Sequence, residues 1–334
     1  MPDTRIDHGV ETAHDFMVGL NAVIVAVVGD NPCVLVVPNS REDPSREGLA
    51  ALPFGPFEPG RHRTLDMGLR SWVAAQTGLR LGYVEQLYTF GDMGRDPREV
   101  RGGPRVISIG YLVLTRAPEP DPATATQWRD WYTFFPWEDW RRGRPAALSE
   151  CIEPSLRRWI KAAGNRAEER ERAERAAVSF GLDGADWSED LVLERYELLY
   201  EIGLVEEALR DRGKAADASI GFSRPMALDH RRILATGISR LRGKIKYRPV
   251  VFELMSPEFT LLNLQRLVEA LSGKRLHKQN FRRLVEREGL VESTGTIDTR
   301  TGGRPAVRFR FRREILAERS AVGFKLPSVA AHRG

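Results

Sequence analysis

The apolar positions in the C-terminal part of the chain predict two successive helices. Thr260 is placed to cap the first helix, whose apolar residues recur at helical spacing on one face: Leu261, Leu264, Leu267, Val268 and Leu271. Residues 272–273 (Ser-Gly) end this helix. A second helix is predicted over about 277–288, and its buried stripe is expected to consist of Phe281, Leu284 and Val285.

A basic two-stranded hairpin is predicted directly after the second helix. A strand begins at 290–291, a Gly-rich loop follows over 294–305 (TGTIDTRTGGRP), and 307–311 returns as the alternating strand VRFRF. The order of helix, short turn, basic helix and basic ribbon is that of a winged helix-turn-helix. In such a module the second helix fills the major groove of DNA and the wing lies against the backbone.

The N-terminal part shows the pattern of an α/β domain. The apolar run over 16–28 is typical of a central strand, and 33–37 is expected to pair back on it as a hairpin. A helix is predicted at Leu65–Thr77, with Gly78 as its C-terminal cap. Two further strands are expected at Tyr83–Phe90 and Arg105–Leu114.

The middle of the chain, about 146–211, has a different pattern. A long charged helix is predicted over 155–180 and a second helix over 187–210, as an inserted helical hairpin that serves packing or dimerisation. The run RAEERERAER at 166–175 is interpreted as a solvated helical face. After a small-residue linker at 214–225, a helix over 228–247 is expected to lead into the winged helix.

Charge is strongly polarised along the 334 residues. Residues 226–334 contain 23 Lys and Arg against 10 Asp and Glu, whereas the rest of the chain contains 28 against 36. A basic domain of this kind is typical of phosphate binding, although such residues can also simply solvate a helical surface. We expect a sensor domain at 1–145, a helical insertion and linker at 146–225, and a DNA-binding domain at 226–320.

The composition excludes several other classes of protein. A long apolar run and a signal-peptide pattern are both missing, so neither a membrane span nor secretion is expected, and a cytoplasmic location is predicted. The two cysteines, Cys33 and Cys151, have no ligand-forming neighbours in sequence, which argues against a disulfide framework and a zinc site.

Candidate DNA-binding residues lie on the second helix and on the wing. Gln279 and Asn280 carry amides suited to adenine edges, although Asn280 is equally suited to cap or brace the turn. Arginine on this helix can read guanine or hold phosphate, and wing arginines suit phosphate or the minor groove. The predicted DNA-binding set is Lys278, Gln279, Arg282, Arg283, Arg300 and Arg304.

Residues 52–79 resemble the box of the Nudix family, but the functional positions of that box are lost. Arg63, Trp72, Ala75 and Gln76 stand where this family has metal-binding glutamates, and Ser71 replaces the arginine. A helix without these carboxylates has no oxygen ligands for Mg²⁺. We therefore predict no catalytic residues, no metal site, no cofactor and no cation-dependent hydrolysis.

Further motifs narrow this resemblance. Residues 87–92 (LYTFGD) and 95–98 (RDPR) look like a segment of the Nudix-related transcriptional regulators of NAD metabolism. Similar motifs of that family follow at 226–230 (MALDH), 259–260 (FT), 280–283 (NFRR) and 301–305 (TGGRP). The resemblance covers roughly 16–140 and 226–313. It implies a Nudix fold, often inactive, joined to a winged helix that binds operator DNA as a homodimer and answers to ADP-ribose or related nucleotides.

A candidate effector site follows from the same segment. Phe90, Gly91, Arg95 and Arg98 are suited to hold a diphosphate, through close backbone approach and bidentate arginine contacts. A salt-bridged loop is the alternative interpretation of these arginines. Residues 229–230 (Asp-His) suggest chemistry at first sight, but a cap and a packed contact between domains are the favoured interpretation.

The predicted fold class is α+β: a Nudix-like α/β/α sandwich, a helical insertion and a C-terminal winged helix-turn-helix. The predicted function is a dimeric transcription regulator that binds double-stranded operator DNA and an ADP-ribose-like nucleotide. Two alternatives remain open from the sequence. One is a divergent Nudix pyrophosphatase with carboxylates outside the box, and the other is a protein-interaction module in which the winged helix binds partners.

Overall fold

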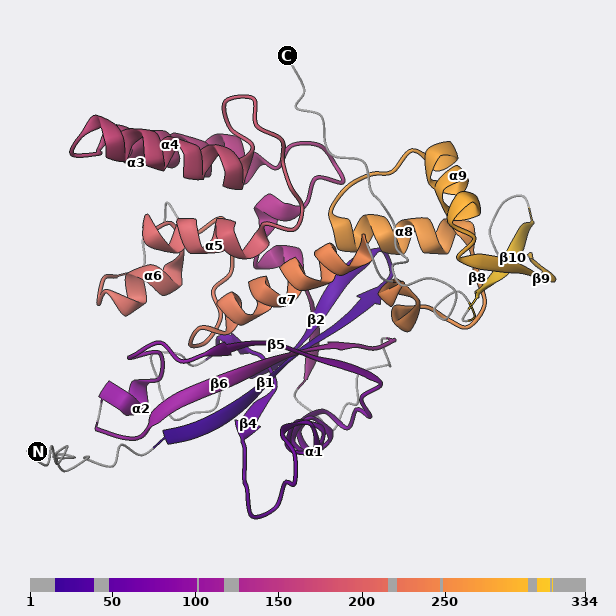
Figure 1. Cartoon of the computed structure of the whole chain (residues 1–334), viewed down its shortest axis with the longest axis horizontal. Coiled ribbons are helices and arrows are strands. Elements are labelled where there is room, and N and C mark those ends of the chain that lie inside the picture. The colour runs from indigo at the N-terminus through magenta and orange to yellow at the C-terminus, as the bar shows by residue number, and fades with distance from the viewer. Residues whose placement is uncertain are drawn as a thin grey trace, which may run out of the picture.

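The structure is a computed structural model, and it describes residues 16–38, 48–100, 102–116, 126–215, 221–246, 249–299, 305–312 and 314. A twisted sheet occupies one half of the molecule, the helical insertion lies beside it, and the winged helix projects at one end (Figure 1). In the part of the chain that is described, no helix is long and apolar enough to span a membrane.

The sheet is built around one long central strand, as predicted. β1 (Phe16–Val28) pairs antiparallel with β2 (Asn31–Pro38) and parallel with β6 (Arg105–Leu114). β5 (Tyr83–Phe90) pairs antiparallel with β6 at the edge of the order β3-β2-β1-β6-β5. Three short strands complete the sheet: β3 (Ala50–Ala51), β4 (Phe54–Pro56) and β7 (Gln127–Asp130).

Two helices cover the opposite faces of this sheet and make it an α/β/α sandwich. On one face, α1 (Leu65–Thr77) is capped by the Thr64 side chain and ends at Gly78 in the left-handed conformation, with φ of 70°. On the other face, α7 (His230–Ile245) crosses β1 so closely that a Cβ at Gly237 would lie 2.8 Å from Val23. The helix predicted over 228–247 is therefore present, and it packs on the sheet.

The insertion contains more breaks than the predicted hairpin, which was wrong in this respect. The expected helix over 155–180 is two helices, α3 (Glu153–Lys161) and α4 (Arg166–Phe180), because Asn165 caps the start of α4. The expected helix over 187–210 is α5 (Val192–Glu201) and α6 (Glu206–Asp211), which are separated at Gly203 with φ of 75°. A π-helical turn, η4 (Leu148–Ile152), leads into α3.

Residues 131–138 (WYTFFPWE), here called the aromatic segment, join the sheet, the insertion and the winged helix into one core. The segment forms two short helices, η2 (Trp131–Thr133) and η3 (Pro136–Glu138). A separate four-residue helix, α2 (Pro97–Val100), follows β5. Trp131 and Trp137 are fully buried in a cluster that continues through α5 and α7 to α8. Of the two roles predicted for the insertion, packing is thus observed within this chain.

The winged helix has the predicted order of elements. It comprises η6 (Val250–Leu254), β8 (Phe259–Thr260), α8 (Leu261–Ser272), α9 (Lys278–Glu288), β9 (Val291–Asp298) and β10 (Ala306–Phe311). Thr260 caps α8 in a capping box with Asn263, and β10 lies between β8 and β9 in the wing sheet.

The predicted wing loop over 294–305 was too long. β9 continues through Thr294 to Asp298, since Thr294, Thr296 and Ile297 are β-branched and favour a strand, and Gly295 takes the positive φ that a side chain would disfavour. The register also shifts between Val307 and Phe309 on β10, which marks an irregularity in the pairing.

Candidate DNA-binding surface and effector cavity

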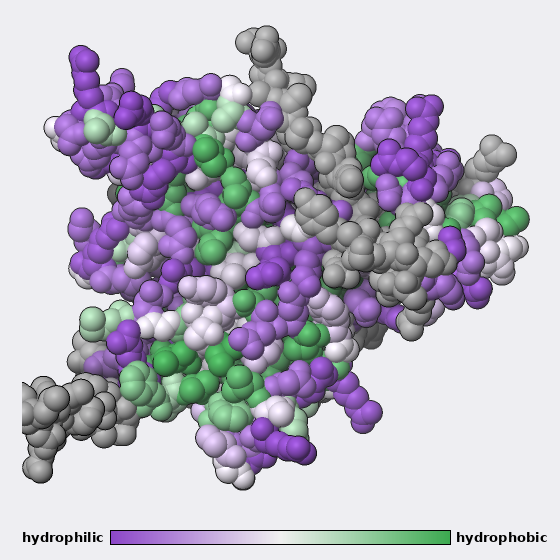
Figure 2. All heavy atoms as spheres, viewed as in Figure 1, coloured by the Kyte–Doolittle hydropathy of each residue, from purple (hydrophilic) through white to green (hydrophobic). Residues whose placement is uncertain are grey.

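The recognition helix α9 presents a polar, basic face to solvent. Its Phe281 and Val285 side chains are 3% and 1% exposed, and Leu284 is half-buried, so the predicted inner stripe is confirmed. The residues on its other side are all exposed: Lys278, Gln279, Asn280, Arg282 and Arg283. The molecular surface over α9 is correspondingly hydrophilic (Figure 2).

The turn before α9 is held by side chains of α8. Gln265 donates from Nε2 to the carbonyl of Leu276 at 2.9 Å, and the Glu269 carboxylate accepts from the Leu276 amide at 2.9 Å. These contacts fix the direction in which α9 leaves the turn. Asn280 lies within α9, whose N-cap is His277, so Asn280 is not the cap that the sequence allowed.

The wing adds two arginines that the sequence analysis did not single out. Arg308 on β10 pairs with Asp298 at 3.1 Å, and Arg310 pairs with Glu292 at 2.6 Å across the ribbon. The alternating sequence VRFRF could have indicated these two arginines, because residues two apart on a strand lie on the same face. Arg300 and Arg304, the predicted wing contacts, lie outside the described residues.

The C-terminal end of α8 is tied to the aromatic segment and to α7. The Tyr132 hydroxyl donates to the carbonyl of Ala270 at 2.7 Å, and Arg242 of α7 donates from Nε to the carbonyl of Leu271 at 2.9 Å. Helix C-terminal carbonyls lack intrahelical partners, and these two donors satisfy them in the interior. The position of the recognition module is therefore fixed relative to the sandwich.

A buried charge cluster strengthens this junction. The Glu138 carboxylate, from the aromatic segment, pairs with Arg195 of α5 at 2.5 Å and with Arg242 at 2.6 Å, and all three side chains are at most 1% exposed. Lys274, in the turn before α9, pairs with Glu189 in the segment before α5 at 2.6 Å. Sequence reasoning missed all three ion pairs, because they connect residues far apart in the chain.

The positions of the lost Nudix glutamates have taken on packing roles. Trp72 donates from Nε1 to the carbonyl of Pro56 at 2.6 Å, and a Cβ at Gly55 would lie only 2.2 Å from the Trp72 indole. Gln76 accepts from the Phe54 amide at 3.2 Å and donates to the Phe54 carbonyl at 2.6 Å. These side chains hold β4 against α1.

The remaining box positions provide no metal ligands. Arg63, Ser71 and Ala75 are exposed. Among the described residues, no group of three or more His, Cys, Asp and Glu side chains is placed to hold a metal ion.

The candidate effector arginines are both engaged with carboxylates. Arg95 binds Asp229 through Nε at 2.9 Å and Nη2 at 2.6 Å, and it also donates to the Ser108 hydroxyl at 2.7 Å. Arg98 pairs with Asp96 at 2.8 Å. Phe90 is 2% exposed, and Gly91 is half-buried at the start of the loop that carries both arginines.

Asp229 and His230 connect this loop and β4 to the start of α7. Asp229 occupies the N-cap position of α7, as expected, but its carboxylate binds Arg95 and makes no cap hydrogen bond. Burial raises the pKa of Asp229 even though Arg95 favours its charged form. His230 is buried and accepts from the Leu52 amide at Nδ1, 2.9 Å away, as the predicted packed contact requires.

A cavity of about 630 Å³ lies where the Arg95 loop meets α5, α6 and the start of α7. Arg95 and Arg232 are its only lining cations among the described residues, against five lining carboxylates. The aromatic rings of Tyr196 and Tyr200 form part of its wall. The insertion therefore supplies half of a site that the sandwich alone would leave open.

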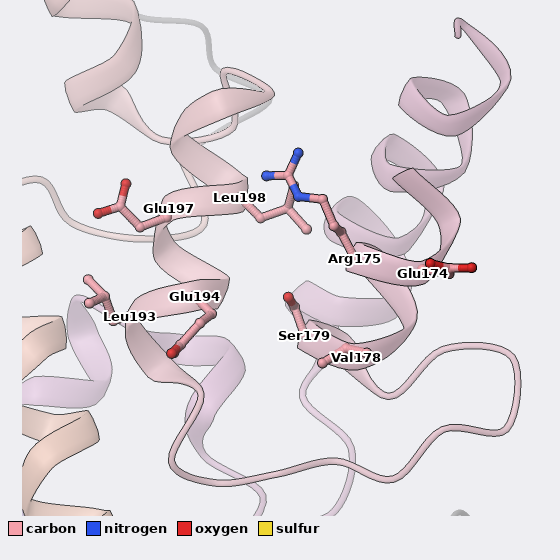
Figure 3. Close-up of a pocket in the computed structure, with 8 residues that line it drawn as sticks. All are labelled: Glu174, Arg175, Val178, Ser179, Leu193, Glu194, Glu197 and Leu198. Carbon is pink, nitrogen blue, oxygen red and sulfur yellow. The ribbon is translucent and has the colours of Figure 1, made fainter. Parts of the chain in front are cut away.

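A second groove, of about 490 Å³, runs between α4 and α5 (Figure 3). Glu174, Glu194 and Glu197 lie along it, and Arg175 at its side pairs with Glu201. Arg175 is its one lining cation among the described residues, against three lining carboxylates, so the groove offers a single guanidinium to a phosphate-bearing ligand.

The comparisons with known proteins agree with this architecture. Residues 251–311 match the family model described as the NrtR DNA-binding winged helix domain. The ADPR responsive transcriptional repressor NtrR of Acinetobacter baylyi is 38% identical over 86 residues, which make up 26% of this chain and 34% of that protein. The matched region thus spans about a third of that relative's length.

Solved structures extend the similarity of the fold to most of the chain. Shewanella oneidensis NrtR complexed with a 27mer DNA has a TM-score of 0.52 and 21% identity, and the match covers 88% of this chain and 93% of that chain. A MutT/nudix family protein from Enterococcus faecalis has a TM-score of 0.50 and 14% identity, with 93% and 89% covered. The fold therefore defines a class: a Nudix-fold domain joined to a winged helix. Within that fold, residues 251–311 are similar to the NrtR DNA-binding winged helix domain.

Proposed function

We propose that this chain is a DNA-binding transcriptional regulator, acting as a repressor in the manner of the relative from Acinetobacter baylyi. The observation that carries the proposal is the exposed basic face of α9, which is held outward by the burial of Phe281 and Val285. A helix of this kind enters the major groove, and its N-terminal residues contact base edges.

The proposed contacts are divided between bases and phosphates. Gln279, Arg282 and Arg283 read base edges, because amide and guanidinium groups match the hydrogen-bonding patterns of adenine and guanine. Lys278, Arg300 and Arg304 bind phosphates and set the register of the helix in the groove. We propose a homodimer, because two such modules would read two half-sites about one helical turn apart.

The sandwich is proposed to bind a nucleotide without hydrolysing it. Trp72 and Gln76 are committed to holding β4, so the helix that would carry metal ligands is used for packing. A divergent pyrophosphatase would need metal ligands elsewhere, and no described cluster of suitable side chains supports it.

The proposed effector is an ADP-ribose-like nucleotide that binds in the cavity beside Arg95. Gly91 and Arg98 belong to the segment that borders this cavity, and Phe90 is the last residue of β5 before it. Because Asp229 already neutralises Arg95, the diphosphate must displace this carboxylate to bind the guanidinium. Displacement frees the start of α7, whose other end is bound to α8 through Arg242. A ligand that binds the two arrangements differently shifts the population of DNA-binding states.

Selection of bound fragments from the genome of origin tests the proposal. The full chain, incubated with sheared genomic DNA in low salt, is expected to enrich fragments that share a two-fold symmetric site. A matched protein with Arg282→Ala and Arg283→Ala serves as the control and should lose the enrichment. Equal recovery of all fragments by both proteins would rule out sequence-specific binding and favour the protein-interaction alternative.

A further inference from the structure

The segment 140–144 (WRRGR), here called the arginine loop, lies directly beside the turn that leads into α9. The Trp140 amide donates to the carbonyl of Gly273, the C-cap of α8, at 2.8 Å. Arg275, in the turn itself, donates from Nε to the carbonyl of Arg141 at 3.2 Å. A loop that follows the sandwich in sequence is thus joined through its backbone to the helix-turn-helix.

The three arginines of this loop differ in how they are neutralised. Arg141 is largely buried and pairs with Asp139 at 2.8 Å, so its charge is used within the protein. Arg144 is 45% exposed and pairs with Glu153 at 2.8 Å. Arg142 is exposed and is not hydrogen-bonded or ion-paired within the described residues, although its charge helps to lower the pKa of the nearby Asp139.

The loop is also held firmly in place. The Trp140 ring lies 4.8 Å from the Trp187 ring, centroid to centroid, and Arg141 donates to the carbonyl of Asp30 at the β1–β2 turn. Arg142 therefore projects from a fixed backbone, and ordering it on a ligand costs side-chain entropy alone.

The location of the loop indicates its ligand. The wing follows the C-terminal end of α9, whereas the arginine loop lies beside the turn before its N-terminal end. A helix that docks in the major groove with its N-terminal residues on base edges brings the turn before it close to the flanking backbone, so a basic group beside this turn is placed near phosphates. Two further cations lie nearby: Arg275 is 69% exposed, although it pairs with the buried Glu269, and Lys278 is exposed.

We propose that the arginine loop is a second DNA-binding element, in which Arg142 binds a backbone phosphate next to the groove that α9 reads. The inference rests on the proposed function, because it requires α9 to dock on duplex DNA. It gives the sandwich side of the molecule a direct contact with DNA. Guanidinium is suited to this contact because its planar donors bind phosphate oxygens in pairs.

The test compares full-length Arg142→Gln with full-length Arg170→Gln on a duplex long enough for two half-sites. Arg170 is an exposed arginine on α4, a helix that lies away from α9 (Figure 1), so it controls for loss of one positive charge. Each lost phosphate contact is expected to make the slope of log affinity against log salt shallower by about 0.9. When salt rises from about 50 to 200 mM, the affinity of Arg142→Gln should therefore fall by a factor that is roughly threefold to fourfold smaller, per half-site, than the factor for the wild type.

Ethylation interference gives a second readout. Arg142→Gln should lose interference at one phosphate per half-site, while the pattern for Arg170→Gln should equal that of the wild type. Preference for one duplex sequence over another should stay constant, since a phosphate contact carries no base information.

The possible failures are distinguishable. If Arg282→Ala impairs binding but Arg142→Gln and Arg170→Gln match the wild type at every salt concentration, the arginine loop is a solvated surface and the inference is wrong. If the wild type binds no duplex, the proposed function itself is wrong. If both single-charge variants weaken binding equally, the effect is due to net charge, and the specific contact is excluded.

Discussion

Glu138 and Arg242 form an ion pair of 2.6 Å in which both side chains are fully or almost fully buried. The same Arg242 donates to the last turn of α8, and the same Glu138 accepts from Arg195 of the insertion. One carboxylate therefore connects the aromatic segment, the insertion and the helix-turn-helix. The position of α9 depends on this junction.

Replacement of Glu138 by Gln should destabilise the fold strongly. The change leaves two buried guanidiniums without a counter-charge, and removing one partner of a buried pair costs about 3–5 kcal/mol. Chemical denaturation measures the free energy of unfolding. Glu58→Gln is the control, because Glu58 pairs with the exposed Arg61 and its loss should cost at most about 1 kcal/mol. Similar losses for the two variants would contradict the role given to Glu138.

The protein should not hydrolyse ADP-ribose detectably, and introducing glutamates at the Nudix-box positions should not produce this activity. We expect no turnover of ADP-ribose with Mg²⁺ above a no-enzyme control, for the wild type and for a variant with Trp72→Glu, Ala75→Glu and Gln76→Glu. The variant should also melt at a lower temperature, because it loses the Trp72 and Gln76 bonds to β4, each worth about 1 kcal/mol. Chromatography of the products provides the measurement. Metal-dependent activity that co-purifies with the wild type would support the pyrophosphatase alternative.

Effector binding should depend in opposite directions on Arg95 and Asp229. Asp229→Asn removes the competing carboxylate and should tighten binding of ADP-ribose, whereas Arg95→Gln removes the phosphate partner and should weaken it.

Operator DNA should change nucleotide affinity by the factor by which nucleotide changes DNA affinity, with a coupling of about 1–3 kcal/mol. Calorimetric titrations with and without operator measure both quantities. Equal nucleotide affinity in the two titrations would leave the sandwich as a scaffold without a sensing role.

Acid should weaken the link between the insertion and the turn before α9. Burial alone would raise the pKa of Glu189, but the nearby Lys274 outweighs it and brings the pKa below its ordinary value of 4.5. Because the folded-state pKa is lower than the unfolded one, the stabilisation is present above about 4.5 and is lost as pH falls through the folded pKa.

The variant Glu189→Gln should therefore lose less stability than the wild type when the pH is lowered from neutral to below 4.5. Denaturant midpoints across this range give the comparison. Glu169→Gln, on an exposed position of α4, should keep the wild-type slope. A wild-type slope in Glu189→Gln would show that this pair does not contribute to the pH dependence.

Much of the fold follows from local sequence signals. The ends of α1 were predictable because Thr64 caps it and Gly78 stops it, and β1 was predictable from its long β-branched run. The outward side of α9 was predictable because Phe281 and Val285 recur at helical spacing. These features depend on residues close together in the chain, where periodicity and capping chemistry act.

The features that sequence did not predict depend on distant residues. The breaks at Asn165 and Gly203 are exceptions: a capping Asn and a Gly with positive φ are local signals, and the sequence analysis overlooked them. The pairs of Arg95 with Asp229 and of Lys274 with Glu189 connect positions more than 80 residues apart, which periodicity cannot reveal. The cavity has walls from the sandwich and from the insertion, so neither segment alone indicates it.

Titration of an operator duplex with full-length protein, followed by fluorescence anisotropy at increasing salt, tests the central claim most directly. We expect log affinity to fall linearly with log salt, with a slope of about −0.9 for each phosphate contacted. Arg282→Ala or Arg283→Ala should weaken binding by about 1–3 kcal/mol where the arginine reads a base. Failure to bind any duplex in about 50 mM salt, or an affinity independent of salt, would contradict the assignment of this chain as a DNA-binding regulator.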